Sequence, residues 1–269
     1  MKYAVVSDIH ANSEALENVL KAIDRLQVDK IVCLGDTVGY YANPNECLEI
    51  FQKRNIQSVA GNHDRAGTGL KQVIAGCGVA GRRGIAWTRA RLSLENKKFL
   101  NNLPLFDEVD GQFLMVHGSL YPEPNEEIYI KRDMNTVRKN FDVLTAFQSK
   151  PKICFFGHTH HPVCYQYSGG KILEIAPGAI CLNTADYFRI NPGSVGQSRD
   201  DDPRASFLAY DTRTNVAHFY RVDYNRKVCL AKARRAGLLY EESGFRRTVV
   251  RMLDKMGIKE FIKKGLRKR

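Results

Sequence analysis

The quartet Gly61-Asn62-His63-Asp64 directly follows residues 56–60 (Ile-Gln-Ser-Val-Ala), which we expect to form a strand. Four other short motifs with polar side chains follow apolar, β-branched runs: Asp8-Ile9-His10, Gly35-Asp36, Val116-His117-Gly118 and Gly157-His158-Thr159-His160. Such runs are typical of buried strands, so we expect each motif where a strand ends and a loop begins. Ligands of α/β proteins bind beyond the ends of parallel strands. The five motifs therefore predict one shared site.

The first 64 residues predict alternating strands and helices. Residues 2–7, 31–34 and 56–60 are expected to form buried strands. Ser13 opens an amphipathic helix, and residues 43–46 (Asn-Pro-Asn-Glu) resemble a capping box with proline at the first helical position. This β-α-β-α-β order is typical of a parallel sheet with right-handed crossovers.

The remaining chain changes from crossover units to hairpins. We expect helices in residues 65–102, interrupted by glycines at 76–84, and in 135–147, with buried strands at 112–116 and 153–156. Antiparallel pairs are expected for 163–167 with 171–175, and for 207–210 with 217–222. Two sheets packed face to face, with helices outside, would fit this order.

Length and composition limit the class of protein. The 269 residues, 43% hydrophobic, suffice for one large α/β domain or two small ones. No apolar run approaches the roughly 18 residues of a membrane span. The first strand begins at once and leaves no room for a signal peptide, so a cytoplasmic location is expected. The seven cysteines contain no CxxC pair and are expected to be reduced and structural.

The positive charge is concentrated at the carboxyl end. Residues 221–269 hold 16 Lys and Arg against 5 Asp and Glu, and these residues carry +11 of the net charge of +12. We predict a domain at 1–224 and a basic helical extension at 225–269, with two amphipathic helices broken near residues 243–244. The extension fits a nucleic-acid surface, an anionic membrane surface, a partner-docking helix pair or a cover over the domain; its apolar stripe favours the cover.

The motif side chains are ligands for divalent metals. Five of the seven histidines lie in the motifs, at positions 10, 63, 117, 158 and 160. Carboxylate and imidazole groups bind hard to borderline cations. Asp8 and His10 are two residues apart at a strand end, which points them to the same side. His218 stands apart on an apolar strand and is expected to be structural.

The ordered set D-x-H, G-D, G-N-H-D, H and G-H-x-H resembles the calcineurin-like metallophosphoesterase superfamily over residues 2–222. The resemblance implies an α/β fold, a four-layer α/β/β/α sandwich of two mixed sheets flanked by helices. It also implies that one metal is held by Asp8, His10 and His160, and a second by Asn62, His117 and His158. Asp36 would bridge the two ions.

The chemistry expected for such a centre is hydrolysis of a phosphodiester or phosphoanhydride by a metal-bridging hydroxide. His63 is the candidate general acid, and Asp64 is expected to hold its imidazole in the required tautomer. A ligand set without thiolate suits manganese first, with iron, zinc or nickel as alternatives.

Two stretches, residues 35–46 and 191–196, are similar to the small bacterial and archaeal phosphodiesterases of this superfamily, some of which hydrolyse dinucleoside polyphosphates. Residues 37–41 lack the arginine that serine/threonine phosphatases carry there, although Arg65 follows Asp64 and is a candidate substrate ligand. Tyr40 or Tyr41 would either stack on a base or simply pack. Asn191 and Ser194 would belong either to an anion-binding backbone nest or to a tight connection between strands.

Three functions compete. The first is an enzyme acting on a small phosphorylated substrate of the nucleotide or dinucleoside polyphosphate type. The second is a nuclease that holds single-stranded or structured nucleic acid with the basic extension. The third is a non-catalytic scaffold, which the presence of His63 and of all seven ligand positions disfavours. The sequence predicts no oligomeric state.

Overall fold

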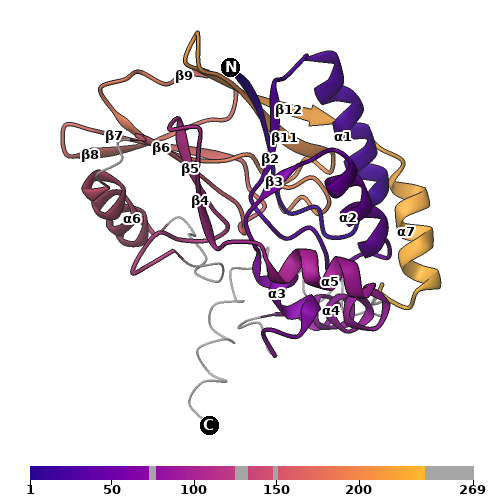
Figure 1. Ribbon diagram of the computed structural model, residues 1–269. Helices are drawn as coiled ribbons and strands as arrows, with labels where there is room; N and C mark the ends of the chain where they lie inside the picture. Colours follow the sequence, from indigo (N-terminus) through magenta and orange to yellow (C-terminus); the bar gives the residue numbers. More distant parts are fainter. Residues whose placement is uncertain (73–76, 125–132, 148–150, 240–269) are drawn as a thin grey trace, which may run out of the picture. The chain divides into compact units, whose positions relative to one another are not determined.

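The structure is a computed structural model that describes residues 1–72, 77–124, 133–147 and 151–239 (Figure 1). Contacts along the chain separate a unit of Met1–Leu238 from a unit of Leu239–Arg269. Helix α7 (Arg226–Arg235), the first of the two predicted basic helices, belongs to the first unit. The second predicted helix, the break at 243–244 and the basic tail lie outside the described residues.

The first unit contains two six-stranded sheets. The first sheet has the order β3 (Gln57–Ser58), β2 (Lys30–Cys33), β1 (Lys2–Val6), β11 (Ala205–Asp211), β12 (Val216–Val222) and β9 (Ala179–Cys181). The second has the order β4 (Phe106–Val109), β5 (Phe113–Val116), β6 (Ile153–Phe156), β10 (Tyr187–Asn191), β7 (Val163–Ser168) and β8 (Lys171–Ile175). Parallel pairs join β1, β2 and β3, and join β5, β6 and β10, whereas the other pairs are antiparallel. Both sheets are therefore mixed, as predicted.

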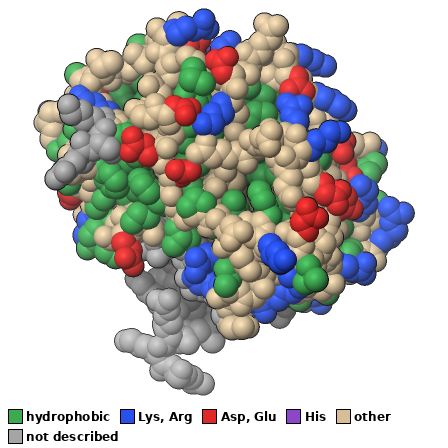
Figure 2. Space-filling model, viewed as in Figure 1, with side chains coloured by type: hydrophobic (Ala, Val, Ile, Leu, Met, Phe, Trp, Pro, Cys, Tyr) green, Lys and Arg blue, Asp and Glu red, His purple; other side chains and the backbone are tan. Residues whose placement is uncertain are grey.

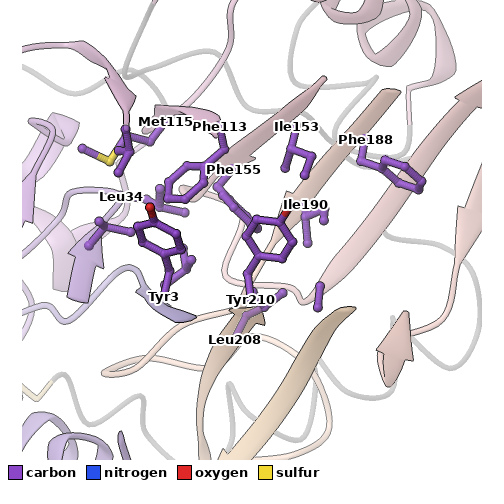
Figure 3. Packing of buried hydrophobic residues seen from close by; sticks show 14 of the residues in the cluster. Tyr3, Leu34, Phe113, Met115, Ile153, Phe155, Phe188, Ile190, Leu208 and Tyr210 are labelled. Carbon is purple, nitrogen blue, oxygen red and sulfur yellow. The ribbon is translucent and has the colours of Figure 1, made fainter. Parts of the chain in front are cut away.

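The two sheets pack face to face through one apolar core. Figure 3 shows Tyr3 and Tyr210 of the first sheet against Phe113 and Phe155 of the second. Strand β1 alternates: Tyr3 and Val5 enter this core, while Ala4 and Val6 face the helices on the other side. Burial on both faces explains why this strand is continuously apolar.

Helices cover the outer face of each sheet (Figure 1). Helices α1 (Ser13–Arg25) and α2 (Pro44–Lys53) pack on the first sheet, and α6 (Met134–Ala146) packs on the second. Helix α7 lies beside α1, where Lys232 forms an ion pair with Glu14. The helices α3 (Asn62–Thr68), α4 (Val79–Arg91) and α5 (Leu94–Asn101) follow β3. The predicted α/β/β/α sandwich is confirmed.

Two helix starts differ in detail from the prediction. Helix α1 begins at Ser13, but its cap is Asn12, whose side chain accepts a hydrogen bond from the Ala15 amide at 3.1 Å. Helix α2 has Pro44 in its first turn, yet Asn43 does not cap the backbone. Its amide instead donates to the Glu46 carboxylate at 2.8 Å.

Several elements were not predicted. Strands β4, β9 and β10 are absent from the sequence analysis, and the strand expected at 56–60 is shortened to β3. The expected glycine interruption is partly wrong, because α4 runs through Gly81 and Gly84. A Cβ atom at Gly84 would overlap the backbone nitrogen of Tyr40, so this glycine allows close packing of α4. Among the described helices, none has the length and hydropathy needed to cross a membrane.

Candidate metal centre

Loops from both sheets meet at the ends of their strands and bring the predicted ligands together. The first sheet contributes the loops after β1, β2 and β3, and the second contributes those after β5 and β6. Six of the seven predicted ligands are at most 1% exposed: Asp8, His10, Asp36, Asn62, His117 and His160. In agreement with this burial, the face drawn in Figure 2 displays no histidine among the described residues.

The ligand atoms form two groups. In the first, the Nε2 atoms of His10 and His160 are 3.1 Å apart, and Asp8 Oδ1 lies 3.3 Å from His160 Nε2 and 3.8 Å from His10 Nε2. In the second, His117 Nε2 lies 3.1 Å from Asn62 Oδ1 and 3.2 Å from Asp36 Oδ2. One ligand atom each of His158, Asp36 and His117 lies within 4.8 Å of the other two.

Asp36 connects the groups, since its Oδ2 atom is also 3.7 Å from His10 Nε2. This grouping is the one that the family resemblance implies. The role of each residue as a ligand stays a prediction.

Backbone carbonyls orient three of the rings. The Nδ1 atoms of His10, His117 and His160 lie 3.1, 2.6 and 2.5 Å from the carbonyl oxygens of Val38, Leu34 and Gln197, respectively. An Nδ1–H that donates to a carbonyl leaves Nε2 with its lone pair free for a cation. All three Nε2 atoms are therefore directed at the cluster.

A buried carboxylate oxygen tests whether cations fit here. Asp8 Oδ2 accepts hydrogen bonds from the Ser7 hydroxyl at 2.6 Å and the His158 amide at 3.1 Å. Asp8 Oδ1 is buried and has no hydrogen-bond partner among the described residues. A buried anionic oxygen without a partner is costly. A cation bound between Oδ1 and the adjacent Nε2 lone pairs would satisfy all of them, so the residues fit a metal.

The electrostatics of the cluster separate its imidazoles. Burial, followed by nearby positive charge, lowers the pKa of His10, His158 and His160, that of His158 to about 3. Burial also opposes the charging of His117, but the Asp36 carboxylate, its hydrogen bond to the ring and the charge of Asp8 raise the pKa of His117 to about 9. Three neutral imidazoles and one imidazolium are therefore expected near neutral pH in the metal-free protein.

Backbone strain is concentrated at the same residues. Five of the seven predicted ligands have a positive φ of 53 to 66°: Asp8, His10, Asp36, His158 and His160. Residues other than glycine seldom adopt this left-handed backbone conformation, and each such residue adds about 1–3 kcal/mol of conformational strain. Strain of this kind clusters at functional sites.

His63 lies beside the first group. Its ring stacks on Tyr40 with centroids 4.8 Å apart and meets the His10 ring edge-on at 4.8 Å. Burial lowers the pKa of His63. The Nδ1 atom of His63 has no hydrogen-bond partner among the described residues. This atom lies against the backbone of Gly39, so close that a Cβ atom at position 39 would overlap it.

The prediction that Asp64 orients the His63 imidazole is wrong. Asp64 lies in the first turn of α3, and its carboxylate accepts four backbone N–H hydrogen bonds. The donors are Asp36 at 2.8 Å, Thr37 at 2.9 Å, Val38 at 3.2 Å and Gly61 at 2.9 Å. A carboxylate at this position of a helix turns back to the free amides of its amino-terminal end. Asp64 therefore positions the Asp36 loop.

Two of the predicted substrate ligands are buried and form hydrogen bonds within the protein. Asn191 donates to the carbonyl of Gly157 at 2.7 Å and to the hydroxyl of Thr159 at 3.0 Å. The Ser194 hydroxyl donates to the Asp8 carbonyl at 2.8 Å and accepts from the Gln197 amide at 2.8 Å. Both residues are at most 1% exposed, and the amides of Val195 and Gly196 donate to the carbonyls of Ser7 and Asp8. These contacts favour the tight connection for residues 191–196, and contact of Asn191 and Ser194 with substrate stays a prediction.

Tyr40 and Arg65 have different surroundings. One face of the Tyr40 ring contacts His63, which leaves less of it for a base. Arg65 lies half-buried in α3, and its contact with substrate stays a prediction.

Arg199 is not among the residues predicted from the sequence, and its guanidinium donates to the Tyr40 hydroxyl at 3.3 Å. It lies three residues beyond the stretch 191–196, in a polar run without periodicity.

A two-sheet sandwich that gathers carboxylates and imidazoles at its strand ends is the arrangement of a metal-dependent hydrolase. Residues 1–215 match the calcineurin-like phosphoesterase superfamily domain, and the chain belongs to this superfamily. It is accordingly a metal-dependent phosphoesterase.

The chain is similar to three known proteins. Uncharacterized protein MJ0912 of Methanocaldococcus jannaschii is 37% identical over 231 residues, which cover 85% of this chain and 90% of that protein. The crystal structure of a metallophosphoesterase from Sphaerobacter thermophilus has a TM-score of 0.73 and 34% identity, covering 89% of this chain and 95% of that one. Hypothetical protein PH1004 from Pyrococcus horikoshii has a TM-score of 0.70 with the same coverage and 18% identity, a likeness of fold alone.

Proposed function

We propose that this protein hydrolyses a phosphodiester or phosphoanhydride of the nucleotide or dinucleoside polyphosphate type at a dinuclear metal centre in the cytoplasm. One observation carries the proposal. The Asp36 carboxylate lies between two complete sets of ligand atoms, 3.7 Å from His10 and 3.2 Å from His117. A carboxylate shared by two such sets can hold two ions a few ångströms apart, which is the arrangement of a two-metal hydrolytic site.

The residues that would hold the ions follow from the two groups. Asp8, His10 and His160 would hold the first ion, Asn62, His117 and His158 the second, and Asp36 both. When bound, the two cations neutralise charge on the phosphoryl group and lower the pKa of water. Manganese is the first expectation, with iron, zinc or nickel as alternatives, because the set combines oxygen and nitrogen without thiolate.

His63 would supply the proton. In hydrolysis, a water oxygen bonds to phosphorus while the bond from phosphorus to the leaving oxygen breaks, and His63 gives its proton to that oxygen. The lowered pKa of the buried ring makes its protonated form a stronger acid. Stacking on Tyr40 holds the plane of the ring.

Turnover with Mn²⁺ tests the proposal. Wild type, His117→Ala and His218→Ala would be assayed on a chromogenic phosphodiester, its monoester, diadenosine tetraphosphate and single-stranded DNA. His218 is the matched control, since it is an exposed histidine on β12. Loss of a ligand should reduce turnover by more than about 100-fold, whereas the control should retain it. No turnover by wild type with any of the four metals would refute the proposal.

The nuclease alternative depends on the basic extension, most of which lies outside the described residues. The same assay on a chain ending at Leu239 separates the two functions, because DNA cleavage that requires residues 240–269 would identify a nuclease.

A further inference from the structure

Arg199 is an exposed arginine in the loop between β10 and β11. Its Nη2 atom donates to the Tyr40 hydroxyl at 3.3 Å, and no other hydrogen bond or ion pair of this guanidinium occurs among the described residues. A guanidinium has five N–H donors in a rigid, planar fork. Most of the donors of Arg199 are therefore available to a ligand.

No ion pair joins Arg199 to a neighbouring carboxylate in the part of the chain that the structure describes. Asp200 forms an ion pair with Arg221, and Asp202 forms one with Arg204. Arg199 instead contacts the Tyr40 hydroxyl, and the Tyr40 ring lies edge-on to the ring of the predicted ligand His10. An unneutralised cation next to a site for phosphate esters is suited to a substrate anion.

The position of Arg199 relates it to the leaving group. The Tyr40 ring, whose hydroxyl contacts Arg199, stacks on His63 at 4.8 Å and meets His10 edge-on at 4.7 Å. His63 is the proposed proton donor to the leaving oxygen. A group that reaches past Tyr40 to Arg199 therefore belongs to the leaving part of the substrate.

We infer that Arg199, held by the Tyr40 hydroxyl, binds a second phosphate of the substrate on the leaving-group side, and that the preferred substrate is a phosphoanhydride. The inference rests on the proposed function and names its substrate class. The leaving group of a simple diester carries no charge where Arg199 lies, whereas that of an anhydride is itself a phosphate. Planar N–H pairs of arginine match phosphate oxygens in geometry and charge.

The reaction balances without further reactants. A water molecule gives one proton to solvent, which later replaces the proton lost by His63, and the water oxygen bonds to the attacked phosphorus. The bridging bond from phosphorus to oxygen breaks, and the bridging oxygen leaves with the second phosphate. The proton of His63 goes to that oxygen, and Arg199 stays protonated beside the departing anion. Tyr40 acts as a positioning residue for Arg199.

Comparison of two substrates distinguishes binding of a second phosphate by Arg199 from a contribution of Arg199 to the turnover of any substrate. Full-length Arg199→Ala, Arg199→Lys and Tyr40→Phe would be compared on diadenosine tetraphosphate and bis-p-nitrophenyl phosphate with Mn²⁺. For the dinucleotide, Arg199→Ala should raise KM by about 10- to 100-fold, and the other two variants should raise it less. For the chromogenic diester, kcat/KM should change by less than about 3-fold, because no second phosphate is present. Arg204→Ala, an ion-paired arginine of the same loop, should match wild type on both.

A binding measurement accompanies the kinetics. Calorimetric titration of the full chain with a methylene-bridged, non-hydrolysable analogue of the dinucleotide should show the same loss of affinity in Arg199→Ala, both with Mn²⁺ and after chelation. Equal losses on both substrates would overturn the inference, as would unchanged kinetics and binding for the dinucleotide.

The two proposals can fail separately. If wild type cleaves the diester but neither cleaves the dinucleotide nor binds its analogue, the inference fails and the proposed function stands. If wild type cleaves neither substrate, the proposed function fails, and the titration alone decides whether Arg199 binds a phosphate.

Discussion

The Nε2 atoms of His10 and His160 face each other across 3.1 Å, and both rings are held in that position by backbone carbonyls at Nδ1. Burial, followed in each case by the charge of a neighbouring histidine, lowers the pKa of both rings, so two lone pairs oppose each other in the metal-free protein. A cation between them converts this repulsion into two bonds.

Metal should therefore stabilise the fold. At a free Mn²⁺ concentration of about 100 Kd the stabilisation is about 2.7 kcal/mol. For a domain of this size it should raise the Tm by roughly 5–10 °C. Differential scanning calorimetry with Mn²⁺ and with chelator measures the shift. His160→Gln should abolish it, and His218→Ala should preserve it; equal shifts in both variants would count against the cluster as the binding site.

Metal binding should also release a proton. The pKa of His117 is raised to about 9, so the metal-free protein holds this proton at pH 7.5, whereas a ligand must be neutral. Calorimetric titration with Mn²⁺ in buffers of different ionisation enthalpy should report about one proton released at pH 7.5 and none well above pH 9. A pH-independent value would contradict the role of His117.

The same shift predicts a pH dependence of stability without metal. A histidine whose folded pKa exceeds the unfolded value of about 6.5 contributes stability fully present below pH 6.5. This contribution is lost as the pH rises through about 9. Urea unfolding in chelator should show falling stability across this window, and His117→Asn should flatten the profile.

The ligand motifs could be predicted from sequence because each is local: a polar pair or triplet adjoins the apolar run that forms its strand. Strand β10, in contrast, could not be predicted from the sequence. Its central residue, Arg189, is 1% exposed, and a charged residue argues against a buried strand. Arg189 is tolerated because it donates to Asn140 on α6 and lies over the Phe156 ring, contacts that only the folded chain provides.

The roles of Asp64 and Arg199 were missed for a similar reason. Because Asp64 is next to His63 in the sequence, it was expected to bind the imidazole. In the structure α3 begins at Asn62, and the Asp64 carboxylate in its first turn accepts hydrogen bonds from backbone amides. Arg199 and Tyr40 are separated by 159 positions in the chain. Only the folding of the β10–β11 loop over the centre brings them together.

Replacement of Asp64 should separate stability from acid catalysis. Asp64→Asn keeps one carbonyl oxygen for four N–H donors, and the loss of charge-assisted bonds at a fully buried site should cost about 2–4 kcal/mol. Urea unfolding measures this cost. The pH profile of kcat in the folded variant should match that of wild type, because the Asp64 carboxylate accepts hydrogen bonds from backbone amides and not from the His63 ring. His63→Ala should show the reverse pattern, with kcat reduced and stability little changed.

Asn191 offers a test of how the fold supports the centre. Its amide joins the end of β10 to Gly157 and Thr159, which flank His158. Asn191→Ala removes both hydrogen bonds and frees the loop that carries His158 and His160. Affinity for Mn²⁺ should fall by about 10- to 100-fold, as is usual when a residue that orients a metal ligand by hydrogen bonding is removed.

A matched control is Asn183→Ala, since Asn183 also forms side-chain hydrogen bonds but to Asp186, outside the centre. Equilibrium titration with Mn²⁺, followed by tryptophan fluorescence or calorimetry, compares the two variants. If Asn191→Ala binds Mn²⁺ as tightly as wild type, the loop that carries His158 and His160 keeps its conformation without the hydrogen bonds of Asn191. The preorganisation would then come from the strained backbone at His158 and His160 and from the Gln197 carbonyl instead.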